Sequence, residues 1–438
     1  MMKYFYYSLI LLFVARAASA QDIDKIITKP YVDNLIKTLS SDDMQGRATF
    51  SPGIDKAATF IEAEFKKIGL QPLNGASGYR QTFYKYQLNP VSSAVTIDGK
   101  AIDKSDILVL TNKSESINFT QANSDGWIKL DTAKKFKAQI RPLLASKKRQ
   151  LVLVDRKFAA DFKLIKEYFS KGASVDEKDM QQTNPPAVVL VLAPDTAVKE
   201  FSVALKYDLK KMALFNVAGV IPGKSKAKEL VVFSGHYDHL GYLAPVGQDS
   251  IANGADDDAS GTTAMIALAK YYKKLNNNER TLIFVAFTAE EIGGFGSQYF
   301  SKQLNPDEVV AMFNIEMIGK ESKFGKNTAF ITGYERSDFG KILQKNLEGT
   351  AFTFHPDPYT DQNLFYRSDN ATLAALGVPA HTISTDQIDI DKLYHSVKDE
   401  YSSLDTENIL ATIRAIAKSA TTIVNGKDTP TRIAKLSN

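Results

Sequence analysis

The sequence predicts an α/β protein, in which a three-layer α/β/α domain with a mostly parallel, mixed central sheet carries an inserted, mainly β domain. From about residue 211 onward, strand-like and helix-like runs alternate. Residues 89–210 instead contain short β-like runs separated by Lys-rich polar stretches. The chain has 438 residues, enough for one large domain with an insertion.

The first 20 residues have the pattern of a secretory signal peptide. Lys3 precedes the apolar run 9–15, and Ala18-Ser19-Ala20 forms a small-x-small cleavage site before Gln21. The apolar run is too short to span a membrane. We therefore expect an exported protein, periplasmic or extracellular and of bacterial type.

Charge and cysteine content narrow the functional classes. The formal net charge of +4 becomes +2 without Lys3 and Arg16, a balance that predicts neither a nucleic-acid partner nor a membrane partner. The chain has no cysteine, which excludes disulfides and a thiol nucleophile. This absence also favours a bacterial exported protein over a eukaryotic secreted one.

The remaining chain divides into three regions: 21–88, 89–210 and 211–438. The first is expected to be helical, because apolar residues recur at helical spacing from Ile54 to Ile68 and Gly69 provides a stop signal. The insertion has β-like runs at 106–111, 150–154 and 187–193, and a solvated loop is expected at 171–186.

The last region carries the predicted parallel sheet. Its expected strands are 229–233, 281–288, 309–317, 328–332 and 379–383, and its expected helices are 261–274, 337–347 and 406–425. Ligands of open α/β sheets gather beyond the carboxyl ends of the strands. Polar residues at those ends are therefore the candidates for a functional site.

Five clusters of such residues follow strands or lie near their ends. They contain His236 with Asp238, Asp256 within GADDDASG, Glu290 with Glu291, Glu316 within NIEMIG, and His395. Neutral imidazole and carboxylate oxygen both suit Zn²⁺. One of two consecutive glutamates can bind metal while the other handles a proton. Glu316 is embedded in apolar residues, so its burial calls for a nearby cation.

Each cluster alone also has an ordinary structural interpretation. Asp256–Asp258 can offset a helix dipole, Glu290-Glu291 can form an exposed loop, Glu316 can pair with a buried basic side chain, and each histidine can be a satisfied polar residue. Together, two histidines and three carboxylates supply the ligands for a pair of Zn²⁺ ions, and a fourth carboxylate remains as a base.

The motifs together resemble the M28 family of zinc peptidases, the aminopeptidase type. They are HYDHLG at 236–241, GADDDASG at 254–261, AEEIGGFGS at 289–297, NIEMIG at 314–319 and YHS at 394–396. LSSDDMQGR at 39–47 is similar to that family's N-terminal segment. The resemblance covers residues 30–85 and 215–425, whereas 89–210 resembles the family's protease-associated insert only weakly.

The resemblance implies a role for each motif residue. His236 and Glu316 bind one zinc, Glu291 and His395 bind the other, and Asp256 bridges the two ions. Asp238 orients His236, and the Asp256–Asp257 peptide is expected to be cis. Glu290 is the general base, and Tyr394 can stabilise the oxyanion. The family usually has Asp at position 316 and often has His where Asn370 stands.

The leading hypothesis is a secreted di-zinc aminopeptidase that acts on peptides. A glutaminyl cyclase with one zinc, a carboxypeptidase or dipeptidase on the same fold, and a non-catalytic binding protein remain alternatives. The aromatic residues Tyr359, Phe365 and Tyr366 line the substrate pocket or take part in ordinary loop packing. His239, His355 and His381 are expected to serve packing only, and the oligomeric state is left open.

Overall fold

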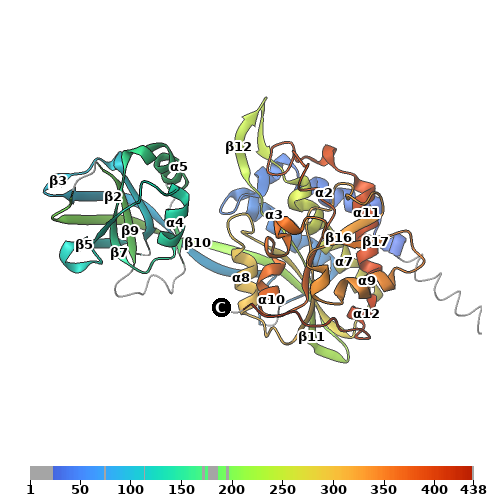
Figure 1. The fold of residues 1–438 in the computed structure, drawn as a ribbon. Coiled ribbons are helices and arrows are strands. Elements are labelled where there is room, and N and C mark those ends of the chain that lie inside the picture. Colours follow the sequence, from blue (N-terminus) through green and yellow to red (C-terminus); the bar gives the residue numbers. More distant parts are fainter. Residues whose placement is uncertain are drawn as a thin grey trace, which may run out of the picture. The chain divides into compact units, whose positions relative to one another are not determined.

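The computed structural model describes residues 23–73, 75–112, 114–169, 173–175, 186–193 and 197–436. The predicted signal peptide, residues 1–20, lies outside these described residues. The chain forms two compact units (Figure 1). Unit 1 comprises Met1–Thr82 with Leu214–Asn438, and unit 2 comprises Phe83–Ala213.

Unit 1 is built on a mixed, mostly parallel sheet, as predicted. Its strands run in the order β17-β16-β18-β15-β11-β14-β10. The central strands β18, β15, β11 and β14 are parallel to their neighbours in this group, and β10 is antiparallel to β14. The strand bounds are β11 Lys226–His236, β14 Arg280–Phe287, β15 Val309–Ile315, β16 Thr328–Ile331, β17 Thr353–Pro356 and β18 Ala380–Ser384.

Helices cover both faces of this sheet because both faces are apolar. In β11, Val231 and Phe233 pack into one core cluster, whereas Val232 between them packs into another. This alternation is the period of two expected of a strand buried on both sides. The first cluster includes residues of α2, α3, α7, α9 and α11, and the second includes residues of α8 and α10. The α/β/α layering is therefore confirmed.

The helices of unit 1 match the predicted ones except for two short additions. Their bounds are α2 Lys29–Leu39, α3 Pro52–Ile68, α7 Gly261–Leu275, α8 Phe295–Lys302, α9 Phe339–Asn346, α10 Asn370–Ala375, α11 Thr406–Ser419 and α12 Thr421–Val424. The expected helix 406–425 is divided into α11 and α12. The sequence did not predict α8, which comes shortly after Glu290 and Glu291, or α10.

The described part of unit 2 is mainly β and includes the helices α4 and α5. One sheet has the order β4-β9-β7-β6, formed by Ile107–Asn112, Ala187–Leu192, Arg149–Val154 and Trp127–Lys129. One of its faces shares a core cluster with α4 (Phe136–Leu144) and α5 (Ala159–Phe169). The other face packs against residues of β2, β5 (Ser116–Thr120) and β10. Of the predicted loop 171–186, Ala173–Val175 form β8, and most of the remainder lies outside the described residues.

Two long strands carry the chain between the units. β2 spans Arg80–Ile97 and β10 spans Phe201–Ile221, and they are neighbours in the sheet. The expectation that residues 22–88 are helical throughout is therefore wrong beyond Ile68. The short β1 (Gln71–Pro72) pairs with β10, and the start of β2 also belongs to the sheet. Within the described part of the chain, no helix combines the length and apolar character needed to cross a membrane.

Candidate metal centre

The predicted site residues meet at the carboxyl edge of the sheet. His236 is the last residue of β11, Glu290 and Glu291 follow β14, and Glu316 directly follows β15. These three strands are parallel neighbours, so their carboxyl ends lie side by side. Ala289, before Glu290, has φ of 61°, and Met317, after Glu316, has φ of 52°. Such positive values are uncommon for residues with a side chain and cluster at functional sites.

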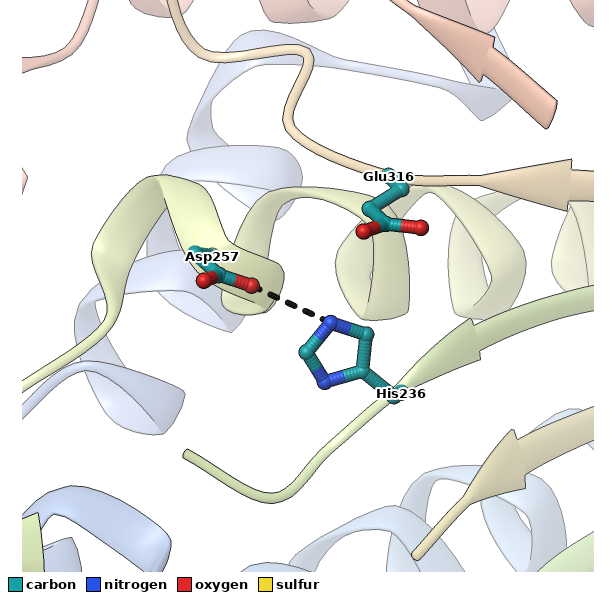
Figure 2. Close-up of side chains that lie close together, drawn as sticks. All are labelled: His236, Asp257 and Glu316. Carbon is teal, nitrogen blue, oxygen red and sulfur yellow. Dashed lines mark ion pairs between the residues drawn. The ribbon is translucent and has the colours of Figure 1, made fainter. Parts of the chain in front are cut away.

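The first group of possible ligands consists of His236, Asp257 and Glu316 (Figure 2). Nε2 of His236 lies 3.1 Å from Oδ1 of Asp257. Nδ1 of His236 lies 3.1 Å from the backbone carbonyl oxygen of Asp238 and donates to it. Nε2 therefore carries a lone pair, and this buried atom has no hydrogen-bond partner among the described residues. An imidazole fixed in this way is prepared to bind a metal ion.

The second group surrounds the other oxygen of Asp257. Nε2 of His395 lies 3.3 Å from Oδ2 of Asp257 and 3.1 Å from Oε2 of Glu291. The His395 side chain is 37% exposed, whereas those of Asp257 and Glu291 are 3% and 6% exposed. The ring of Tyr394 stacks on the His395 ring, with 3.8 Å between centroids. The Asp257 carboxylate therefore faces two sets of possible ligands, His236 with Glu316 and His395 with Glu291.

His239 also belongs to this second group, although no role at the site was expected of it. Its Nδ1 lies 2.8 Å from Oε1 of Glu291 and 3.7 Å from Oδ2 of Asp257. The three side chains form a possible ligand group by proximity. The HYDH motif could have indicated this position, because His239 directly follows Asp238 at the carboxyl end of β11. The expectation that His239 serves packing only is therefore wrong.

The residue between the two groups is Asp257, and the prediction that Asp256 takes this position is wrong. Asp256 turns away: its Oδ1 accepts the Gly319 backbone N–H at 2.7 Å, and its Oδ2 lies 3.3 Å from Nζ of Lys320. The cis peptide likewise joins Asp257 to Asp258 rather than Asp256 to Asp257. Consecutive side chains of the turn η5 (Ala255–Ser260) point in different directions, so a shift of one residue changes which carboxylate enters the site.

A buried arginine holds the loops that present these side chains. The Arg47 guanidinium donates to four backbone carbonyl oxygens, at distances of 2.6–2.9 Å. They belong to Leu39, Tyr237, Asn253 and Gly254. Tyr237 follows His236, whereas Asn253 and Gly254 precede the aspartate turn. Arg47 thus ties the end of β11 to that turn, which gives the 39–47 motif a structural role.

Asp238 supports both glutamates of the next loop. Its Oδ1 accepts the backbone N–H of Glu290 at 3.1 Å, and its Oδ2 accepts that of Glu291 at 3.3 Å. The distance from Oδ1 to Nδ1 of His236 is 3.8 Å, too long for a hydrogen bond. Asp238 therefore orients His236 through its backbone carbonyl, and its carboxylate positions the Glu290–Glu291 loop.

A pocket of about 140 Å³ lies beside the two groups. Among the candidate residues, Asp257, Glu290, Glu291, Glu316 and Tyr394 contribute to its lining. The rest of the lining is mixed, with apolar side chains, hydroxyl side chains, one arginine and one aspartate: Met317, Phe330, Leu364, Ile388, Thr332, Ser368, Thr382, Ser384, Arg367 and Asp386. A ligand in this pocket would therefore contact Glu290 and both groups at once.

Burial and crowding of carboxylates perturb the ionisation of the site. Burial raises the pKa of Glu290 well above its usual value, and the negative charges of Glu316 and Asp369 add to the increase. Burial also raises the pKa of Glu316. Asp257 behaves oppositely: burial opposes its ionisation, but the adjacent imidazoles of His236 and His395 outweigh this and hold its pKa well below the usual range. The candidate metal centre therefore contains an excess of acidic over basic side chains, and most of them are buried.

The residues present fit zinc. The donor atoms are imidazole nitrogens and carboxylate oxygens, which are common Zn²⁺ ligands. Nε2 of His236 is a buried, unpartnered lone pair. Cations at this position would also offset the excess of carboxylates, whose burial without compensation is costly.

The other residues raised by the sequence have packing roles. Asn370 donates to the Phe365 and Ala380 carbonyl oxygens and does not line the pocket. His381 is buried and hydrogen-bonded to Thr332 and Ser337. The aromatic residues considered for the pocket, Tyr359, Phe365 and Tyr366, are also absent from its lining. Their ring contacts, such as Phe365 with Tyr366, are ordinary loop packing. The His355 ring stacks on Phe324.

Comparison with known sequences identifies relatives of this site. Residues 216–420 match the sequence profile of Peptidase family M28. Leucine aminopeptidase 1 of Ajellomyces capsulatus is 28% identical over 212 residues, which cover 45% of this chain and 52% of that protein. Aminopeptidase YwaD of Bacillus subtilis is 30% identical over 108 residues, covering 24% and 22% of the two chains. The chain thus spans about half the length of the first of these relatives and less of the second.

Solved structures share the fold. An aminopeptidase from Aneurinibacillus sp. strain AM-1 superposes with a TM-score of 0.53 at 20% identity, covering 95% of this chain and 97% of that one. A zinc aminopeptidase from Bacillus subtilis has a TM-score of 0.53 at 17% identity, covering 91% and 95% of the two chains. At these identities the likeness concerns the architecture.

Proposed function

We propose an exported di-zinc aminopeptidase function for this chain, which belongs to peptidase family M28 through residues 216–420. The substrate class is a peptide with a free N-terminal amine. The curated relatives described above are aminopeptidases by name, and this chain matches about half the length of the first of them. The proposal therefore depends chiefly on the geometry of the centre.

The observation that carries the proposal is the position of Asp257 between two ligand sets. Its Oδ1 faces His236 at 3.1 Å, and its Oδ2 faces His395 at 3.3 Å. Glu316 completes the first set and Glu291 the second. A carboxylate with each oxygen directed to a different set is the arrangement that a bridging ligand of two ions requires. His236 with Glu316 would hold one zinc, and Glu291 with His395 the other.

Zinc bound in this way would supply Lewis acidity and lower the pKa of a water molecule for attack on the peptide carbonyl. Glu290 acts as the general base: it lines the pocket, lies next to Glu291 in sequence and is mostly buried. Its raised pKa suits a group that takes a proton from the attacking water and returns it to the leaving amine. Asp238 fixes the backbone of Glu290 for this task.

Tyr394 and the apolar part of the pocket lining complete the proposed active site. Tyr394 lines the pocket and stacks on His395, so its phenol can donate to the oxygen that becomes negative during attack. Met317, Phe330 and Ile388 provide apolar surface for a substrate side chain. The sequence pattern of residues 1–20 supports export to the periplasm or the medium.

The test combines metal analysis with hydrolysis of aminoacyl-nitroanilides. We expect about two zinc ions per wild-type chain, as a co-catalytic centre requires. In Glu316→Ala we expect about one, together with loss of hydrolysis. Lys326→Ala, which changes an exposed side chain in the segment between β15 and β16, is the control and should keep both metal and activity.

Other outcomes would replace the proposal. One zinc in the wild type, with pyroglutamate formed from a Gln-initiated peptide, would establish the cyclase alternative. Cleavage of an N-blocked peptide at its C-terminus would indicate a carboxypeptidase. Two zinc ions without hydrolysis of any such substrate would favour a binding protein.

A further inference from the structure

We propose that His239 is a positioning residue for the second zinc: its Nδ1–H donates to Oε1 of Glu291 and so presents Oε2 of Glu291 to the metal. This inference rests on the proposed di-zinc function and concerns a third histidine beyond the two implied by the motif resemblance. Nδ1 of His239 and Oε1 of Glu291 are 2.8 Å apart and form a hydrogen bond.

The two oxygens of Glu291 have different partners. Oε1 faces His239, whereas Oε2 lies 3.1 Å from Nε2 of His395. His395 also approaches Oδ2 of Asp257 at 3.3 Å, so Oε2 is the glutamate oxygen that shares a ligand set with both residues. A donor on Oε1 stops rotation of the carboxylate about its last bond. Hydrogen bonds of this kind orient metal ligands and tune metal affinity.

The hydrogen-bond partners of the two ring nitrogens favour this role over direct metal binding by His239. Nε2 of His239 is buried and has no hydrogen-bond partner among the described residues. If Nδ1 bound zinc, Nε2 would carry the proton and become a buried donor without an acceptor, which is unfavourable. If Nδ1 carries the proton and donates to Glu291, Nε2 has only an unfilled lone pair. His236 differs, because its Nδ1 has the Asp238 carbonyl as an acceptor.

The surrounding backbone is shaped to hold the imidazole in place. The His239 side chain is 0% exposed, and its backbone N–H donates to the Arg47 carbonyl oxygen at 3.2 Å. The ring packs against Gly254, where an added Cβ would lie 2.6 Å from Cγ and Cδ2 of the imidazole. Gly254 has φ of 56°, and it accepts from Arg47 through its carbonyl oxygen. Arg47 is therefore hydrogen-bonded both to the backbone of His239 and to the glycine against which the imidazole packs.

The experiment compares two substitutions that differ in hydrogen bonding. His239→Asn places a side-chain amide N–H near the position of Nδ1–H, whereas His239→Phe fills the volume without a donor. His381→Phe is the matched control, because His381 is equally buried and contacts none of the candidate ligands. Each metal-free protein is titrated with zinc in competition with a chromogenic chelator, which gives an affinity for each of the two sites.

We expect His239→Phe to weaken the weaker of the two zinc sites about 10- to 100-fold, the range typical for loss of a residue that supports a ligand. His239→Asn should stay within about threefold of the wild type, and His381→Phe should leave both zinc affinities unchanged. Equal losses in His239→Asn and His239→Phe would show instead that His239 is a direct ligand. Unchanged affinity in His239→Phe would overturn the proposal.

A second measurement needs no metal and separates this inference from the di-zinc function. The chain has five histidines, so ¹⁵N-histidine labelling gives a simple spectrum of the metal-free protein. We expect His239 to be the Nδ1–H tautomer, with a signal that shifts in Glu291→Ala. The Nε2–H tautomer, or a signal indifferent to Glu291→Ala, would refute the hydrogen bond. A wild type that binds fewer than two zinc ions but gives the expected spectrum would refute the di-zinc function alone.

Discussion

The carboxylate of Asp399 accepts the backbone N–H of Asp257 at 3.0 Å. The same carboxylate accepts the N–H of Asp256, at 2.9 and 3.1 Å to its two oxygens. Asp399 lies four residues after His395, so one segment of the chain contributes a ligand candidate and also fixes the turn that carries the bridging candidate. All of these groups except His395 are buried.

The first prediction concerns this contact. Asp399→Ala leaves two buried N–H groups without acceptors, at a cost of about 1–3 kcal/mol each. We expect lower thermal stability and a loss of zinc, since the position of Asp257 is no longer fixed. Asp405→Ala is the control: Asp405 also accepts two backbone N–H groups, but at the start of α11. It should cost about 0.5–2 kcal/mol and leave the zinc content intact. Full zinc content in Asp399→Ala would contradict the prediction.

The second prediction concerns the proposed base. Glu290→Gln keeps the size of the side chain but removes its capacity to accept a proton. We expect wild-type zinc content and about 10²- to 10⁴-fold slower hydrolysis, the usual contribution of general base catalysis. Steady-state rates on an aminoacyl-nitroanilide measure the effect. Glu348→Gln, at an exposed position, should behave as the wild type. A fully active Glu290→Gln enzyme would remove Glu290 from the mechanism.

The third prediction concerns pH and stability. Burial lowers the pKa of His381 from 6.5 to about 4. The unfolded chain therefore binds a proton at His381 that the folded chain does not, over the range between these two pKa values. The stabilising contribution is complete above the unfolded pKa and is lost as the pH falls towards the folded pKa.

Since one pKa unit corresponds to about 1.36 kcal/mol, the loss at the lower end of this range is about 3 kcal/mol. Urea unfolding at several pH values measures the free energy of unfolding. As the pH falls through this range, this free energy should decrease by about 3 kcal/mol more in the wild type than in His381→Asn. His355→Asn, at a partly exposed ring, is the comparison and should retain most of the wild-type pH dependence. Parallel pH profiles for wild type and His381→Asn would contradict the assignment.

The sequence was sufficient to predict the sheet and the place of the site. Strands such as β11 have a continuous apolar pattern and end at polar residues. The sequence alone therefore identifies both the strand and the candidate ligands at its end. The parallel order then brings those ends together. This reasoning predicts that His236, Glu291 and Glu316 lie within one centre.

The choice between Asp256 and Asp257 could not be made in this way. Three consecutive aspartates give no periodicity, and the conformation of η5 decides which one points inward: Asp257 has non-helical φ and ψ of −100° and 96°. That conformation depends on Asp399 and Arg47, which are far away in sequence. His239 was missed for a related reason, because its partner Glu291 lies on a different loop.

The neighbouring positions of β2 and β10 have a consequence for how this chain can be altered. The Ala218 N–H donates to the Tyr79 carbonyl oxygen at 2.8 Å, and Asn216 donates to Gln81 at 2.9 Å. The chain therefore leaves unit 1 and returns to it at adjacent points of one two-stranded ribbon. Unit 2 occupies the place of a hairpin loop, so we expect that a tight turn or another folded domain can replace it without altering the path of the chain through unit 1. Recombination at this pair of positions would give variants that share unit 1 and differ in unit 2.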